Sequence, residues 1–212
     1  MFSRLVQNTC LLALCSSFII GCAGPKSMSF VDPSYPKLSY EQVKRKTEPL
    51  PLALSAEFQR NGKHLEAADS TLRDETARVL RAAGVIVPTA ENSRGSIKVV
   101  VNNIADLDSA RAKGFGTGLT FGLAGTTVTD AYEMDVVITI GGKTIERRAI
   151  KHELHTAIGN TTLPQGIETV PPSTGFGRIV EQMLLRALRD MQLSGELALM
   201  RLPEPVRLAA RD

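Results

Sequence analysis

The first regular pattern in the sequence is the alternation of apolar and polar residues over residues 52–58. Leu52, Leu54, Ala56 and Phe58 fall on one side of a pleated chain, which predicts a strand with one buried face. Residues 97–104 differ, because they contain an unbroken run of three valines. Such a run is typical of an inner strand that is covered on both faces.

The next pattern predicts a β-hairpin. Apolar residues alternate again over residues 132–140, and the pair Gly141-Gly142 that follows suits a two-residue turn. A return strand is predicted over residues 143–157. The parity of its apolar residues changes part-way along, which predicts a β-bulge near Arg147 and Arg148.

Apolar residues at helical spacing predict two amphipathic helices. The first covers residues 65–83 and is followed by Gly84, a residue type that commonly ends helices. The second covers residues 176–191, with Ser173 or Thr174 as its N-cap. Because the first helix lies between two strands, we expect it to form a crossover connection.

The order of elements is therefore strand, helix, strand, strand, strand, helix. This order predicts an α/β fold of the α+β type over residues 50–193. We expect a two-layer domain in which both helices cover one face of a four-stranded, mainly antiparallel sheet. Residues 194–212 are predicted to be a C-terminal tail.

The first 21 residues have the organisation of a secretory signal peptide. Arg4 is their only charged residue, and their apolar run is too short to span a bilayer comfortably. They end in the sequence Ile19-Ile20-Gly21-Cys22, which has the pattern of a bacterial lipobox. We therefore expect residues 1–21 to be removed and Cys22 to carry acyl chains. The alternative is an ordinary cleaved signal peptide with an unrelated cysteine.

Residues 22–49 are predicted to be a lipidated tether, because they are polar and contain four prolines. The three cysteines are Cys10, Cys15 and Cys22, so the residues after the junction form no disulfide. A flexible tether of this length has an end-to-end distance of about 30 Å. Its basic cluster, Lys44–Lys46, could contact anionic lipid, although we favour a solvated stretch of tether.

The segment of residues 114–129 is rich in glycine, apolar, and free of charge. Gly114, Gly118 and Gly122 are four residues apart, so on a helix they would form one stripe that allows close backbone packing. Phe115, Leu119, Phe121 and Leu123 supply apolar area beside that stripe. The segment is shorter than the roughly 20 residues that span a bilayer as a helix. We expect it to contact the membrane or another subunit, and a flap on its own domain is the alternative.

The chain resembles the TraT surface-exclusion lipoproteins in four features. These are the lipobox, the order of elements, the stretch Ala105-Asp106-Leu107-Asp108 after an apolar strand, and the glycine-rich insert. The YajG-like lipoproteins are similar but have no insert. The resemblance covers most of residues 50–192 and implies an outer-membrane oligomer. It also implies that the glycine-rich segment contributes to membrane association or subunit packing, although the present insert is shorter than that of TraT.

No residue pattern indicates catalysis or a cofactor. His64 lies in a predicted turn, whereas His152 and His155 are three apart on a strand and should face opposite sides. Asp106 and Asp108 could bind a cation weakly, but solvated loop carboxylates are the simpler interpretation. The mature chain has no thiol nucleophile and no G-x-S-x-G motif. We therefore predict no catalytic residue, no metal ligand and no cofactor.

These features predict a non-enzymatic lipoprotein of the outer membrane, facing the periplasm, that acts through protein contacts. Its partners would be the membrane, through the lipid, and other envelope proteins or further copies of itself. The net charge of +3 gives no indication of a nucleic-acid partner. One alternative is a monomeric periplasmic accessory subunit of an envelope transport or assembly machine, using the sheet face or the hairpin edge. A ligand-binding protein or hydrolase is a further alternative, and would need a polar-lined pocket.

Overall fold

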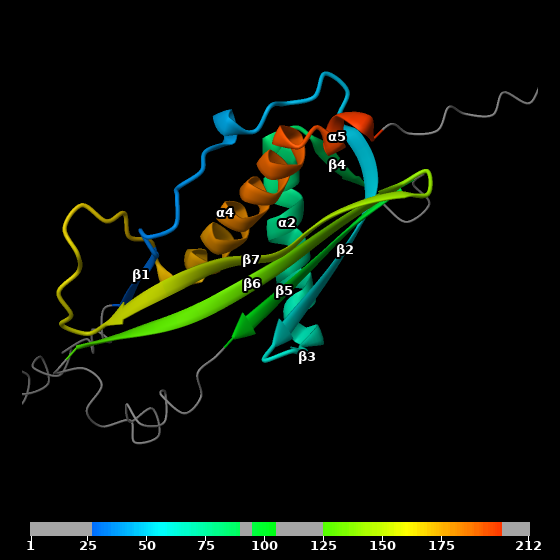
Figure 1. Ribbon diagram of the computed structural model, residues 1–212. Coiled ribbons are helices and arrows are strands. Elements are labelled where there is room, and N and C mark those ends of the chain that lie inside the picture. The colour runs from blue at the N-terminus through cyan, green and yellow to red at the C-terminus, as the bar shows by residue number, and fades with distance from the viewer. Residues whose placement is uncertain (1–26, 90–94, 105–124, 201–212) are drawn as a thin grey trace, which may run out of the picture.

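The structure is a computed structural model that describes residues 27–89, 95–104 and 125–200 (Figure 1). The fold is α+β, with a mixed sheet of seven strands. The two long helices lie side by side on one face of this sheet (Figure 1). The described elements are β1 (Ser27–Val31), η2 (Tyr40–Gln42), β2 (Leu50–Arg60), β3 (Lys63–His64), η3 (Glu66–Ala68), α2 (Asp69–Ala83), β4 (Ile86–Thr89), β5 (Gly95–Ile104), β6 (Thr126–Ile140), β7 (Lys143–Ile158), α4 (Pro172–Leu193) and α5 (Glu196–Leu199).

The sheet corrects the prediction of four strands. Its order is β1-β7-β6-β5-β2-β3, and β4 also pairs with β2. β2 runs parallel to β4 and β5, as the predicted crossover through α2 requires, and the other pairs are antiparallel. The three additional strands, β1, β3 and β4, have five, two and four residues. Such short edge strands carry too few residues for a periodic pattern to be visible in the sequence.

The predicted β-bulge is confirmed. Met134 pairs with Ile150, whereas Val136 pairs with Arg147, so β7 contains one extra residue at this point. Asp135 lies opposite the bulge, and its Oδ1 accepts a hydrogen bond of 2.9 Å from the backbone N–H of Ala149. Ala149 has a φ of 53°, and this bond compensates for the strained conformation.

β5 lies between β2 and β6, as predicted for an inner strand, but only one of its faces is buried. Ile97, Val99 and Val101 are completely buried towards the helices. Lys98, on the opposite face, is exposed and forms an ion pair of 3.0 Å with Glu57. The expectation that both faces are covered, or nearly so, therefore does not hold within the described residues, which place no helix on the second face (Figure 1).

Both long helices bury most of the apolar residues that predicted them. Leu65, where the first helix was predicted to begin, is 41% exposed and precedes α2, which begins at Asp69. α2 ends where Gly84 adopts a left-handed φ of 67°, the conformation that favours glycine there. α4 is longer than predicted and begins with Pro172, and its N-cap residue is Pro171 instead of Ser173 or Thr174. A proline at the first helical position has no N–H to be satisfied, so a polar side-chain cap is less necessary.

Three boundaries differ from those predicted. Residues 27–49, expected in the tether, contain β1 and pack on the domain, with Leu38 and Val43 buried in the core. β6 begins at Thr126, inside the predicted insert of residues 114–129. Residues 194–200, expected in the tail, contain α5 and bury Leu197 and Met200.

Candidate functional site

The segment of residues 32–49, which we call the strap, crosses the helix layer between β1 and β2 (Figure 1). Two glutamine side chains of α4 hold its backbone. The Gln182 amide accepts a bond of 2.7 Å from the Leu38 N–H and donates one of 3.0 Å to the Leu38 carbonyl. Gln192 does the same for Lys44, at 2.8 and 2.6 Å. Each amide thereby satisfies both backbone polar groups of one strap residue.

A carboxylate of α4 makes a third attachment to the strap. Glu181, which is nearly buried, accepts a bond of 2.9 Å from the Tyr40 hydroxyl and lies 3.3 Å from Arg78 and 3.4 Å from Arg178. Burial, and then the bond to Glu181, raises the pKa of Tyr40. The carboxylate is thus fully paired, so its chemistry here is structural.

Beside this network lies a cavity of about 570 Å³ between the strap, the loop before α4, and α4 itself. Tyr35 lies on its wall, stacked on His152 with 4.6 Å between ring centroids and with the Arg186 guanidinium 5.7 Å from its ring. Burial lowers the pKa of His152, which favours a neutral ring in this packed position. This cavity, which polar and apolar side chains line together, was not apparent from the sequence, because its walls come from four separate segments.

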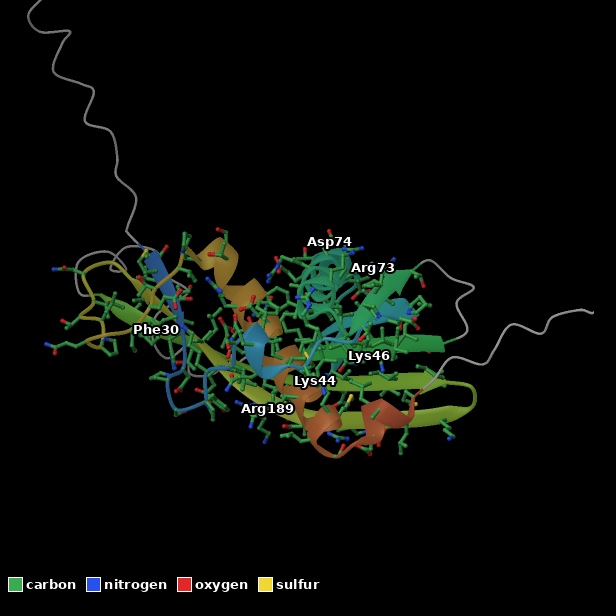
Figure 2. All side chains as sticks on the ribbon, turned by 90° about the horizontal axis from the view of Figure 1, so that it is seen from above. Phe30, Lys44, Lys46, Arg73, Asp74 and Arg189 are labelled. Atoms are coloured by element: carbon green, nitrogen blue, oxygen red, sulfur yellow. The ribbon has the colours of Figure 1, made fainter. Side chains whose placement is uncertain are left out.

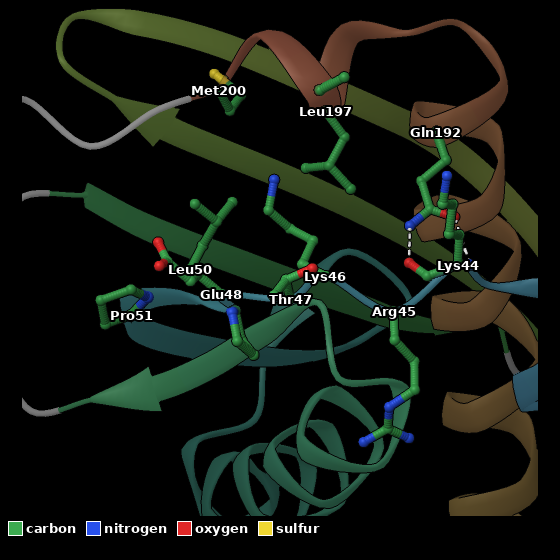
Figure 3. A pocket seen from close by; sticks show the side chains of 12 residues that line it. Lys44, Arg45, Lys46, Thr47, Glu48, Leu50, Pro51, Gln192, Leu197 and Met200 are labelled. Atoms are coloured by element: carbon green, nitrogen blue, oxygen red, sulfur yellow. Dashed lines mark hydrogen bonds between the residues drawn. The ribbon is translucent and has the colours of Figure 1, made fainter.

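A larger cavity, of about 880 Å³, lies between the end of the strap and the segment that follows α4 (Figure 3). Leu50, Leu197 and Met200 form its apolar part, and Lys44 and Lys46 lie on its wall (Figure 3). The cavity therefore combines apolar area with two lysines and the acidic residue Glu48. Such a mixture of apolar and charged groups is typical of a small-molecule site.

The basic cluster at Lys44–Lys46 is therefore an ordered part of the domain, not a stretch of solvated tether. Its three members differ in role. The Arg45 side chain turns away from the cavity and donates a bond of 2.9 Å to the Ala82 carbonyl at the end of α2 (Figure 3), where a positive charge is favourable. Lys44 and Lys46 lie along the strap on the upper side of the molecule, well away from Phe30 (Figure 2).

Asp32, Glu153 and His155 form a cluster at the start of the strap, with one potential ligand atom of each within 4.8 Å of the others. The His155 Nε2 lies 3.1 Å from Asp32, and its Nδ1 lies 2.9 Å from the Thr129 hydroxyl. Hydrogen bonds from Ser34, first among several causes, lower the pKa of Asp32 to about 2. These contacts join the strap to β7, and the set of one imidazole and two carboxylates has the donor types of a zinc site.

The prediction for the histidines is confirmed in part. His152 and His155 lie on opposite faces of β7, since His152 packs on Tyr35 and His155 on Phe30. His64 pairs with Asp69 at 2.7 Å, and this bond raises the pKa of His64. The grouping of His155 with a strap residue was not predicted, because Asp32 was expected in a flexible tether.

The predicted lipidation site, Cys22, lies outside the described residues. The same is true of Asp106, Asp108 and the predicted contact residues Gly114, Phe115, Gly118, Leu119, Phe121, Gly122 and Leu123. The structure does describe the positions at which the chain enters and leaves these regions. Ser27 and Thr126 both pair with Ile158 of β7, so the start of β1 and the start of β6 lie at one end of the sheet.

Comparisons with known proteins give no family. No family model matches the chain, and no curated protein matches it. One solved structure, named only as "Crystal structure of uncharacterized protein", is similar over 69% of the present chain and 91% of its own chain, with 10% identity and a TM-score of 0.30. Among the described residues, no helix is both long and apolar enough to span a membrane.

Proposed function

We propose that the protein is a lipoprotein anchored in the outer membrane through Cys22, and that its domain acts through contacts with envelope proteins or further copies of itself. The lipobox Ile19-Ile20-Gly21-Cys22 supports the anchor. A role without catalysis is supported by the histidines of the described part. Each of them pairs or stacks with a residue that holds two segments of the fold together.

The observation that carries the proposal is the short distance along the chain from Cys22 to the folded domain. β1 begins at Ser27, five residues after the acylated cysteine. Even fully extended, five residues span at most about 18 Å. Acyl chains at Cys22 would therefore hold the domain close to the bilayer, not on a tether of some 30 Å.

The glycine-rich segment is the contact surface that we favour. Gly125, the first described residue after it, lies at the same end of the sheet as Ser27, since the neighbouring Thr126 shares a pairing partner with Ser27. An anchored domain would thus present the segment's end towards the membrane. In that position the uncharged residues Gly114–Leu123 could pack against lipid or against another subunit.

The sheet edges and the outer sheet face support the accessory-subunit alternative less well. β4, at one edge, contains Pro88, and the part of β7 that lacks a strand neighbour carries the bulge and the charged residues Arg148 and Lys151. Such features oppose strand addition. The outer face carries ion pairs such as Lys98–Glu57 and Arg148–Asp135, which a partner would have to desolvate.

Acylation of Cys22 tests the anchor. Cys22→Ser, expressed with its signal peptide, should lose incorporation of labelled palmitate and accumulate as uncleaved precursor. Cys15→Ser is the matched control, because it removes a cysteine of the same signal peptide and should leave labelling unchanged. Normal labelling of the Cys22→Ser variant would show that the proposed anchor is wrong.

The native mass of the detergent-solubilised protein tests the glycine-rich contact. In a non-acylated form of the protein, with detergent present, Gly118→Leu should lower the oligomer mass or the membrane association, because a large side chain blocks close approach of backbones. Thr117→Leu, which places the same side chain beside the glycine stripe, should have a smaller effect. A wild-type protein that is monomeric and indifferent to detergent would instead favour the monomeric accessory subunit.

A further inference from the structure

Three stretches of the described chain meet at one end of the sheet and contain no Asp, Glu, Lys, Arg or His. They are residues 27–31, 125–129 and 156–167, and we call them the uncharged end. They belong together in space because Ser27, Ile158 and Thr126 lie in one row across β1, β7 and β6. In a chain of which 22% is charged, a neutral surface built from three separate segments is a distinct feature.

Hydrogen bonds tie these stretches into one surface. The Thr161 hydroxyl donates to the carbonyls of Thr126 and Ile158, at 3.2 and 3.1 Å. Ser29 and Val170 exchange two backbone hydrogen bonds of 2.8 Å, which attach the end of the loop after β7 to β1. A side chain at Gly125 would come within 2.6 Å of the backbone of Asn160. The loop of residues 159–167 is therefore packed against the strand ends.

The other end of the molecule differs in charge. β6 has 15 residues, so the hairpin turn at Gly141-Gly142 lies about 45 to 50 Å from Thr126 along the strand. Lys143, Glu146, Arg147 and Arg148 follow that turn. The protein thus has one neutral end, next to the start of β1, and one charged end.

We infer that the uncharged end lies against the lipid bilayer that holds the acyl chains of Cys22, with the loop of residues 159–167 in the headgroup region. This inference rests on the proposed function. The domain is held within about 18 Å of its anchor, so one of its ends lies close to lipid. Because the transfer of an ion out of water is costly, the end that carries no charge contacts lipid most favourably. Leu163 and Ile167, which are partly exposed, supply apolar contact area.

The charges nearest to the loop agree with this orientation. Glu168, which follows Ile167, is paired with Lys37 at 2.7 Å and lies 3.6 Å from Arg178. Asp32 is paired with His155. Glu168 is therefore paired with cations of the domain, whereas Asp130, which follows the stretch 125–129, accepts a bond of 3.5 Å from the Asn103 amide. The charged hairpin turn lies at the far end of β6.

Single-cysteine labelling of the acylated protein tests this orientation. Cys10 and Cys15 leave with the signal peptide and the Cys22 thiol is acylated under the proposed function, so an added cysteine is the sole free thiol. Leu163→Cys, Leu199→Cys and Lys143→Cys would each carry an environment-sensitive fluorophore. Leu199 is the matched control because it is 72% exposed and lies on α5. Each protein is reconstituted in vesicles of phosphatidylethanolamine and phosphatidylglycerol, with or without brominated acyl chains.

We expect brominated lipid to quench the fluorophore at position 163, with a blue-shifted emission, and to leave positions 199 and 143 unchanged. Equal quenching at all three positions, or none at any, overturns the inference while acylation of Cys22 still supports the anchor. A blue shift at position 163 without quenching also overturns it, because the loop then contacts another protein. A protein without acyl label in the same preparation overturns both the anchor and the orientation.

Discussion

The attachment of the strap to α4 gives the sharpest test of the fold. Gln182 is 6% exposed and Leu38 is 4% exposed, and the two residues share hydrogen bonds of 2.7 and 3.0 Å. Gln182→Ala removes both bonds and leaves the Leu38 N–H and carbonyl without a partner in a buried position. Because a buried group left unsatisfied costs about 1 to 3 kcal/mol, we expect Gln182→Ala to lower the free energy of unfolding by about 2 to 4 kcal/mol.

Gln192 provides the control, because its side chain holds Lys44 in the same way but in an exposed position. Water can replace both bonds there, so Gln192→Ala should cost less than about 1 kcal/mol. Gln182→Glu is a second comparison. Its carboxylate would be a buried charge that faces the Leu38 carbonyl, so at neutral pH Gln182→Glu should cost at least as much as Gln182→Ala.

Urea unfolding, followed by circular dichroism, measures these differences, and amide hydrogen exchange locates them. In Gln182→Ala, exchange should accelerate first at Leu38 and its neighbours in the strap. Equal unfolding midpoints for Gln182→Ala and Gln192→Ala would refute the reasoning, since the hydrogen bonds between Gln182 and Leu38 would then not be shielded from water.

Three further predictions concern stability. Leu184→Ala should lower the free energy of unfolding by about 2 to 5 kcal/mol, because Leu184 is completely buried on α4. Leu193→Ala, at a position 74% exposed, should change it by less than about 0.5 kcal/mol. Similar urea midpoints for the two variants would show that α4 is not docked as described. Gly84→Ala should cost about 1 to 2 kcal/mol, because φ at Gly84 is 67° and an L-residue is strained there, and its thermal unfolding should be checked against that of wild type. The lowered pKa of Asp32, about 2 against 3.8, stabilises the fold above pH 3.8, and this contribution, at most about 2 kcal/mol, is lost as the pH falls through 2. In Asp32→Asn, the free energy of unfolding should therefore fall less steeply between about pH 4 and pH 2 than in wild type. The same acid dependence in both proteins would contradict the role of this carboxylate.

The central part of the fold could be predicted from the sequence because its elements are long and each has one buried face. The strand pattern repeats over residues 52–58 in β2 and 132–140 in β6, and α2 and α4 repeat a helical pattern over more than ten residues. The bulge near Arg147 was predictable for the same reason, since one extra residue reverses the parity of a long strand. β5 was only partly understood. Its three valines indicate burial on both faces, although Val100 faces the side on which the described residues place no helix.

The strap could not be predicted, because its attachments are polar and distant in sequence. Prolines and charges in residues 32–49 are typical of a linker, and only Leu38 and Val43 are buried there. The polar residue Gln182, on the apolar side of a helix, was the available signal. A buried amide requires partners, and its partners lie more than 140 residues earlier in the chain. No periodicity connects two such positions.

The strap also relates the two ends of the molecule to each other. It begins at Asp32, which contacts His155 near the uncharged end, and its last residues, Lys44–Pro49, line the larger cavity. Gln192 fixes the backbone of Lys44 there, although its bonds are exposed and add little to stability. A contact that costs side-chain entropy for little stability is best explained by the position that it fixes. The position that this contact fixes is that of the Lys44 backbone, at the wall of the larger cavity and at the opposite end of the strap from Asp32.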